Sequence, residues 1–108
     1  MPRPVLLTDD AAADLDEIAG YIARNDTPER AGHVLDRIGQ ALAGLEESPE
    51  RGPVPAELAA LGVRTYREVF FKPYRIIYRV MPDSVLVFLI ADGRREMQAL
   101  LQRRLLEA

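Results

Sequence analysis

The residues best suited to chemistry are arginines gathered in the second half of the chain. Residues 64–108 carry nine Arg and Lys against five Asp and Glu, a balance of +4. Residues 1–63 carry five Arg against twelve acids, a balance of −7, and the two sum to the net charge of −3. Guanidinium groups present planar forks of N–H donors that suit phosphate. The asymmetry therefore indicates either a surface that binds another macromolecule or a chance clustering of solvated charges.

Two of these arginines lie in a run that alternates as a strand does. Tyr74, Ile76, Tyr78 and Val80 would point to one face of a sheet, and Arg75, Ile77 and Arg79 to the other. The strand-like runs 64–71 and 85–90 flank it, across Lys72-Pro73 and the turn 81–84. The pattern predicts a three-stranded antiparallel meander. Its last run is apolar on both faces, which is typical of a central buried strand.

Helices are predicted before and after this meander along the chain. Residues 3–8 form a short strand candidate, and Thr8 or Asp9 caps a helix that ends near residues 24–25. Thr27 and Pro28 begin a second helix, which Ser48-Pro49 stops, so that the two form a hairpin. A proline-rich loop over 48–62 contains one helical turn at 57–61, and a C-terminal helix carries Leu100, Leu101, Leu105 and Leu106.

The expected fold is therefore α+β, a single domain over residues 1–108. An antiparallel sheet, made of the N-terminal strand and the meander, is packed by the helical hairpin and accompanied by a C-terminal helix. The chain has no cysteine, no signal-peptide core and no apolar run near the about 18 residues that span a membrane. We expect a cytoplasmic protein without membrane contact. With His33 as the one histidine, we expect no metal and no cofactor.

The order of the elements, together with four short stretches, resembles the RelE/ParE superfamily of type II toxin-antitoxin toxins. The stretches are residues 74–80, residues 85–90, Gly93-Arg94-Arg95-Glu96 and residues 13–22. The last stretch is typical of the ParE branch. The resemblance covers nearly the whole chain. Each motif alone is weak, but in this order and at these spacings the motifs are fairly specific for the superfamily.

The resemblance implies one of two activities. RelE-like toxins cut messenger RNA in the ribosomal A site without a metal, and ParE-like toxins poison DNA gyrase. Members of both branches are neutralised by a small antitoxin, often with a ribbon-helix-helix or other DNA-binding domain, in a heterotetramer or larger complex. By motif, Arg75 takes the place of the nucleases' strand arginine, Arg95 that of the arginine in Gly-Lys-Arg-Glu, and Arg94 that of its lysine. These three would be the catalytic residues of a RelE-like enzyme.

Departures from the nuclease pattern favour the ParE branch. Leu100 and Leu101 stand where RelE-like nucleases place an aromatic residue or histidine, and no lysine precedes Lys72. A guanidinium cannot serve as a general base at neutral pH, which leaves only tyrosines for proton transfer. Whether the chain is an enzyme stays open. The alternatives are a RelE-like endoribonuclease and a non-toxic nucleic-acid-binding module. Proton transfer would fall to Tyr66, Tyr74 or Tyr78.

For the binding surface we expect Arg75 and Arg95 to converge beside the helical hairpin. An acidic or amphipathic antitoxin segment would meet the basic half. Arg94 and Arg95 could instead pair with Asp92, Glu96 or Glu68, and the C-terminal leucines could serve packing alone. The residues assigned to target or antitoxin binding are Arg75, Arg79, Arg94, Arg95, Leu101 and Arg104.

Overall fold

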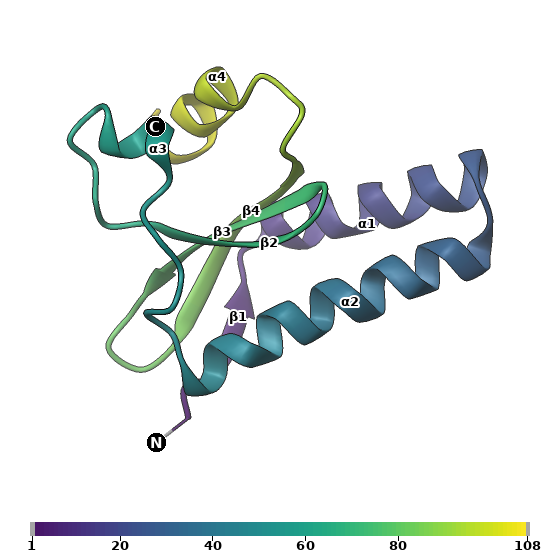
Figure 1. Ribbon diagram of the computed structural model, residues 1–108, viewed down its shortest axis with the longest axis horizontal. Coiled ribbons are helices and arrows are strands. Elements are labelled where there is room, and N and C mark those ends of the chain that lie inside the picture. Colours follow the sequence, from purple (N-terminus) through teal and green to yellow (C-terminus); the bar gives the residue numbers. More distant parts are fainter. Residues whose placement is uncertain (1, 108) are drawn as a thin grey trace.

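The computed structural model describes residues 2–107, and its centre is a four-stranded sheet (Figure 1). The strands are β1 (Val5–Leu7), β2 (Arg67–Phe71), β3 (Tyr74–Val80) and β4 (Val85–Asp92), in the order β1-β4-β3-β2. The predicted meander is confirmed, and the third run is central, since β4 lies between β1 and β3. β1, however, pairs with β4 in parallel. The sheet is therefore mixed and not antiparallel throughout.

The helical hairpin consists of α1 (Asp9–Asn25) and α2 (Pro28–Glu47). Thr8 Oγ1 accepts a hydrogen bond of 3.1 Å from the amide of Ala11, and Thr27 Oγ1 accepts one of 3.0 Å from that of Arg30. These caps satisfy helix N–H groups that have no partner within the helix. Both predicted helices are confirmed. The hairpin crosses one face of the sheet, and its tip projects well beyond the sheet (Figure 1).

The main core lies between the hairpin and this face of the sheet. Ile38 and Leu45 of α2 are fully buried there against Ile76 and Tyr78 of β3. The alternation predicted for β3 is thus confirmed, because Ile77 belongs to a separate core on the opposite face. Other members of the main core are Ala11, Ile22, Ala31, Val34, Val85, Val87 and Ile90.

The opposite face is covered by short helices from two distant segments. α3 (Ala56–Ala59) comes from the proline-rich loop, and α4 (Met97–Leu101) continues into a π-helical turn, η1 (Gln102–Leu106). They lie together in Figure 1, away from the hairpin. This second core consists of Leu58, Tyr66, Ile77, Leu89, Ala91, Met97, Leu100 and Leu101. β4 is apolar on both faces because it lies between two helical layers. Within residues 2–107, none of the helices has the length and apolar character to cross a membrane.

Candidate target-binding and partner-binding site

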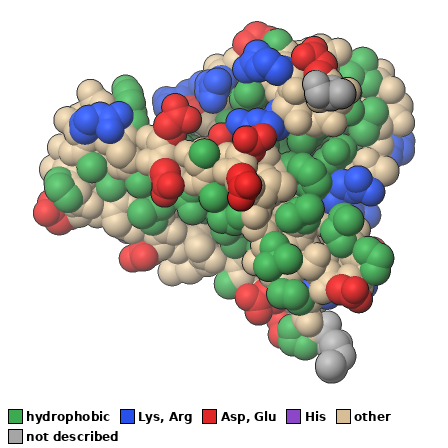
Figure 2. Space-filling model, turned by 180° about the vertical axis from the view of Figure 1, so that it is seen from behind, with side chains coloured by type: hydrophobic (Ala, Val, Ile, Leu, Met, Phe, Trp, Pro, Cys, Tyr) green, Lys and Arg blue, Asp and Glu red, His purple; other side chains and the backbone are tan. Residues whose placement is uncertain are grey.

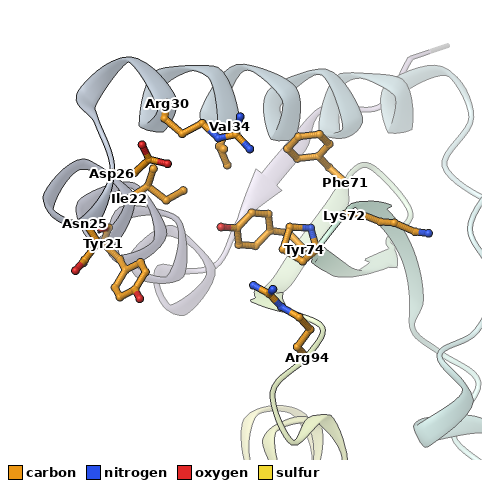
Figure 3. Close-up of a pocket in the computed structure, with 11 residues that line it drawn as sticks. Tyr21, Ile22, Asn25, Asp26, Arg30, Val34, Phe71, Lys72, Tyr74 and Arg94 are labelled. Carbon is orange, nitrogen blue, oxygen red and sulfur yellow. Dashed lines mark hydrogen bonds between the residues drawn. The ribbon is translucent and has the colours of Figure 1, made fainter.

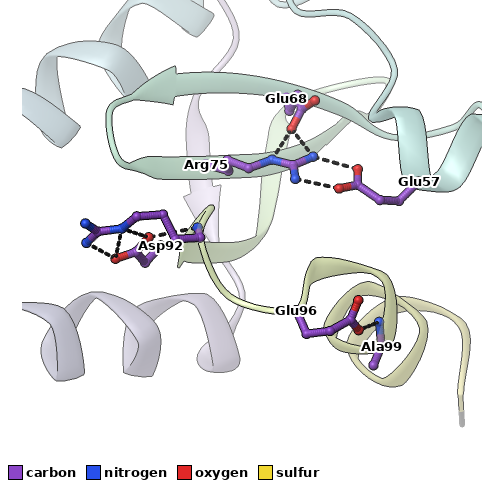
Figure 4. Close-up of polar contacts among 7 residues, drawn as sticks. Glu57, Glu68, Arg75, Asp92, Glu96 and Ala99 are labelled. Atoms are coloured by element: carbon purple, nitrogen blue, oxygen red, sulfur yellow. Dashed lines mark hydrogen bonds and ion pairs between the residues drawn. The ribbon is translucent and has the colours of Figure 1, made fainter.

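Arg75 is held by two carboxylates on the α3 side of the sheet (Figure 4). Its Nη1 and Nη2 donate to Glu57 of α3 at 2.7 and 2.8 Å, and its Nε donates to Glu68 of β2 at 2.8 Å. The path of the side chain needs a glycine next to it, because a Cβ atom on Gly93 would lie 2.8 Å from Arg75 Cδ. The Arg75 side chain is 13% exposed, so its guanidinium is largely enclosed.

This ion cluster leaves little positive charge for a ligand. Hydrogen bonds with Glu57 raise the pKa of Arg75, and the same bonds lower the pKa of Glu57. For Glu68, burial raises the pKa and outweighs the hydrogen bond with Arg75, which lowers it. Because Arg75 is paired with two carboxylates, this cluster carries no net positive charge. The expectation that Arg75 binds phosphate is therefore not supported in the free chain. The partner that occupies the guanidinium, Glu57, comes from a loop segment that the sequence pattern did not connect with β3.

Arg94 lies on the hairpin side of the sheet, away from the guanidinium of Arg75. It lines two pockets with Tyr21 of α1 and Tyr74, whose ring points to the face opposite Arg75. Its Nε and Nη2 donate to Asp92 at 2.9 and 2.6 Å, which confirms the alternative that Arg94 pairs with Asp92. Arg95 lines the second of these pockets. The expected convergence of Arg75 with the Gly-Arg-Arg corner is therefore wrong. Tyr74 lines the pockets with Arg94 and Arg95, and Arg75, the next residue of β3, points to the opposite face of the sheet.

Arg104 fastens the C-terminal segment to the hairpin and the sheet. Its two terminal nitrogens donate to both carboxylate oxygens of Asp14 in α1 at 2.8 Å, and Nη1 also donates to the carbonyl of Phe88 at 3.1 Å. Asp14 accepts a third bond of 3.0 Å from the amide of Ile90. Because β1 ends opposite Val87, these two side chains bond to β4 groups that β1 does not reach. The structure thus gives Arg104 a structural task, and the binding role assigned to it from sequence stays a prediction.

Leu101 and Arg79 also have structural neighbours. Leu101 has no exposed surface and belongs to the second core, so its predicted binding role would require this core to open. The predicted alternative, that the C-terminal leucines pack, describes it better. The guanidinium carbon of Arg79 lies 5.7 Å from the centroid of the Tyr66 ring, which is a cation–π contact. A binding role for Arg79 stays a prediction.

Two adjoining pockets of about 430 and 440 Å³ lie beneath the projecting hairpin. Figure 3 shows the first of them. Both are lined by Tyr21, Ile22, Tyr74 and Arg94. The first extends to the N-terminal turn of α2 and the β2–β3 turn, the second along α1 to the end of β4. The first is further lined by Asn25, Asp26, Arg30, Val34, Phe71, Lys72 and Pro73, and the second by Asp14, Glu17, Ile18, Arg24, Ile90, Ala91, Asp92 and Arg95.

Sequence reasoning missed Tyr21, Arg30 and Lys72 as members of this site. A usable signal existed for Tyr21, which is adjacent to the apolar stripe of α1 but not on it. In the structure Tyr21 is 63% exposed. A large exposed aromatic residue at the rim of a pocket is typical of a binding surface. No comparable signal marked Arg30, because only the fold brings the start of α2 next to the end of β4.

An α-helical hairpin laid over a β1-β4-β3-β2 sheet, with a short C-terminal helix behind, is the fold of ParE and RelE toxins. The solved chromosomal ParDE TA system from P. aeruginosa superposes with a TM-score of 0.70 at 24% identity, over 83% of this chain and 95% of that one. The toxin-antitoxin complex RelBE2 from Mycobacterium tuberculosis gives a TM-score of 0.59 at 22% identity, over 85% and 92%. At these identities the likeness shows the fold alone.

The sequence places the chain within this class. The model of the family described as ParE toxin of type II toxin-antitoxin system, parDE, matches residues 5–97. Toxin ParE3 from Caulobacter vibrioides is 28% identical over 100 residues, which cover 93% of this chain and 96% of that protein. The chain therefore belongs to the ParE family of type II toxin-antitoxin toxins.

Proposed function

We propose that this chain is a toxin that inhibits DNA gyrase and is neutralised by a cognate antitoxin. The observation that carries the proposal is the family match over residues 5–97, which includes the hairpin, the sheet and the pockets between them. Inhibition would proceed by binding, with no bond made or broken by the toxin itself. The antitoxin would be a second, DNA-binding chain in a hetero-oligomer.

The arrangement of tyrosines and arginines argues against the RelE-like alternative. RNA cleavage requires cations at the phosphate and a proton-transfer group within reach of the same atom. Arg75 is occupied by Glu57 and Glu68 on one side of the sheet. The Tyr78 hydroxyl is buried on the other side, where it accepts a 3.2 Å hydrogen bond from the amide of Gly52. Burial raises the pKa of Tyr78, so the phenolate that could act as a base is scarce at neutral pH.

Internal pairing also argues against a non-toxic nucleic-acid-binding module. The basic half seen in the sequence is partly neutralised by the acidic half, since Arg75 pairs with Glu57 and Arg104 with Asp14. Figure 2 shows further acidic side chains spaced along the projecting hairpin. Non-specific binding to nucleic acid depends on many phosphate contacts from Lys and Arg. A chain with a net charge of −3 and these internal pairs offers few such contacts.

The decisive experiment is a supercoiling assay with purified gyrase and relaxed plasmid. Increasing amounts of the chain should leave the plasmid relaxed, and regulated expression in a bacterial host should stop growth. The double variant Arg94→Ala/Arg95→Ala should inhibit less, because both side chains line the exposed pockets. Arg103→Ala is the matched control, since Arg103 is exposed on η1 and lines neither pocket. Full supercoiling at saturating wild-type protein would refute gyrase inhibition, and codon-linked cuts in translated messages would favour the nuclease.

A further inference from the structure

The first pocket combines unpaired cationic groups with an apolar floor. Among residues 2–107, the Arg30 side chain makes neither an ion pair nor a hydrogen bond, although it lines a pocket of about 430 Å³. In Figure 3, Arg30 enters this pocket from α2 and Arg94 from the segment after β4, with the ring of Tyr74 between them. Lys72 lies at the rim. Ile22, Val34 and Phe71 supply the apolar part of the lining.

The chemistry of the three central groups suits a single carboxylate. Arg30 retains all its N–H donors, and Arg94 retains one terminal nitrogen because Asp92 accepts only from its Nε and Nη2. The Tyr74 hydroxyl adds an O–H donor, and burial raises its pKa, so it remains protonated at neutral pH. The ion pair of Arg94 with Asp92 is exposed and therefore weakly held, so Arg94 can turn toward a ligand.

We propose that the first pocket binds an Asp or Glu side chain of an amphipathic segment of the antitoxin, through Arg30, Tyr74 and Arg94. A neighbouring apolar side chain of the same segment rests on Ile22, Val34 and Phe71. The identity of the partner rests on the proposed function, whereas the carboxylate preference rests on the geometry of the pocket.

The surroundings of the pocket favour an acidic peptide over nucleic acid. Within the lining, Arg30, Lys72 and Arg94 face one acid, Asp26, and at its edge Asp92 pairs with Arg94, so the positive field is local. Outside the lining, Asp16 of α1 and Glu29 and Asp36 of α2 are exposed along the hairpin. A peptide carboxylate with apolar neighbours uses the local cations and the floor together. A polyanion would need a continuous basic track, whereas the adjoining pocket is lined by Asp14, Glu17 and Asp92.

The test is a coupling measurement with peptides selected for binding to this chain. A phage-displayed library of short random peptides is selected against the purified chain, and the enriched peptides are synthesised with a fluorescent label. Enriched peptides should share an Asp or Glu near a Leu, Ile or Phe. Replacing that acid by its amide should weaken binding about tenfold to the wild type, but hardly at all to Arg30→Gln. Arg103→Gln is the matched control and should respond like the wild type. Tyr74→Phe should show an intermediate loss.

The outcomes separate this inference from the proposed function. Enriched peptides without an acid, or an equal effect of the amide on the wild type and Arg30→Gln, would overturn the carboxylate site even where gyrase inhibition is observed. A single-stranded oligonucleotide that binds more tightly than the peptides at physiological ionic strength, and loses affinity in Arg30→Gln, would overturn it in favour of nucleic acid. Retained peptide coupling with no gyrase inhibition would refute the proposed function and leave the carboxylate site standing.

Discussion

Removing the carboxylate of Asp14 should destabilise the fold far more than its place on a surface helix suggests. Asp14 is 9% exposed and accepts three hydrogen bonds, two from Arg104 and one from the amide of Ile90. In Asp14→Ala, the Ile90 amide loses its acceptor, and an unsatisfied buried donor costs about 2 kcal/mol. The Arg104 side chain is 22% exposed, so water partly replaces its lost partner. The broken ion pair therefore adds only about 1 kcal/mol. The expected total is about 3 kcal/mol.

The measurement is equilibrium unfolding in urea, followed by far-ultraviolet circular dichroism. The midpoint should fall while the slope m stays the same, since the surface exposed on unfolding changes little. The melting temperature should fall by roughly 15 °C for a domain of this size. Asp14→Asn keeps an acceptor for the Ile90 amide and should lose about half as much free energy of unfolding.

The matched control is Asp16→Ala, two residues further along α1. Asp16 is exposed and makes no side-chain hydrogen bond among residues 2–107, so its removal should change stability by less than about 0.5 kcal/mol. A double-mutant cycle of Asp14→Ala with Arg104→Ala should show a coupling energy of about 1 kcal/mol or more. If Asp14→Ala costs no more than Asp16→Ala, the C-terminal segment is not fastened to β4 as described.

Four further substitutions test other parts of the structure. Hydrogen bonds from Arg75 lower the pKa of Glu57 below its ordinary 4.5, so the pair's stabilisation is complete above that pH and is lost as the pH falls below it. Urea unfolding of Glu57→Gln should therefore show a loss of about 1 kcal/mol at neutral pH that shrinks in acid, and a loss independent of pH would contradict this. Gly52→Ala places a Cβ atom against the carbonyl oxygen of Glu68 and should lower the melting temperature, whereas the open position of Gly32 should tolerate alanine or gain stability. Leu101→Ala should cost about 3 kcal/mol in urea unfolding, and unchanged stability would restore Leu101 as a candidate surface residue.

The elements that sequence predicted correctly are those with local signals. Thr8 and Thr27 cap the two helices, and the alternation from Tyr74 to Val80 sets the two faces of β3. Each of these features depends on residues within about one or two turns of each other. The parallel pairing of β1 with β4 has no such signal, because it joins segments some 80 residues apart in register. The tail helix was predicted, but its π-helical end was not.

The candidate site was harder to predict because it depends on which charges meet in space. Arg75 and Arg104 have the sequence pattern of ligand-binding groups, but the fold supplies Glu57 and Asp14 as their partners, 18 and 90 residues away in sequence. Both partners come from the acidic half of the chain and both arginines from the basic half. Some of the charges that suggested a binding surface therefore form ion pairs that join the two halves of the chain.

A cation that makes no ion pair and also lines a pocket is a better guide to function than net charge. Among residues 2–107, four side chains meet both conditions beneath the hairpin: Arg24, Arg30, Lys72 and Arg95. Arg30 belongs to the acidic half, so a count over segments of sequence would not assign it to a basic surface. Removing the charge of an arginine that pairs across the two halves, Arg75 or Arg104, should lower stability. Removing the charge of Arg30 should leave stability unchanged and weaken partner binding. The two effects can be measured on the same purified variants, which separates the arginines that hold the fold from those available to a partner.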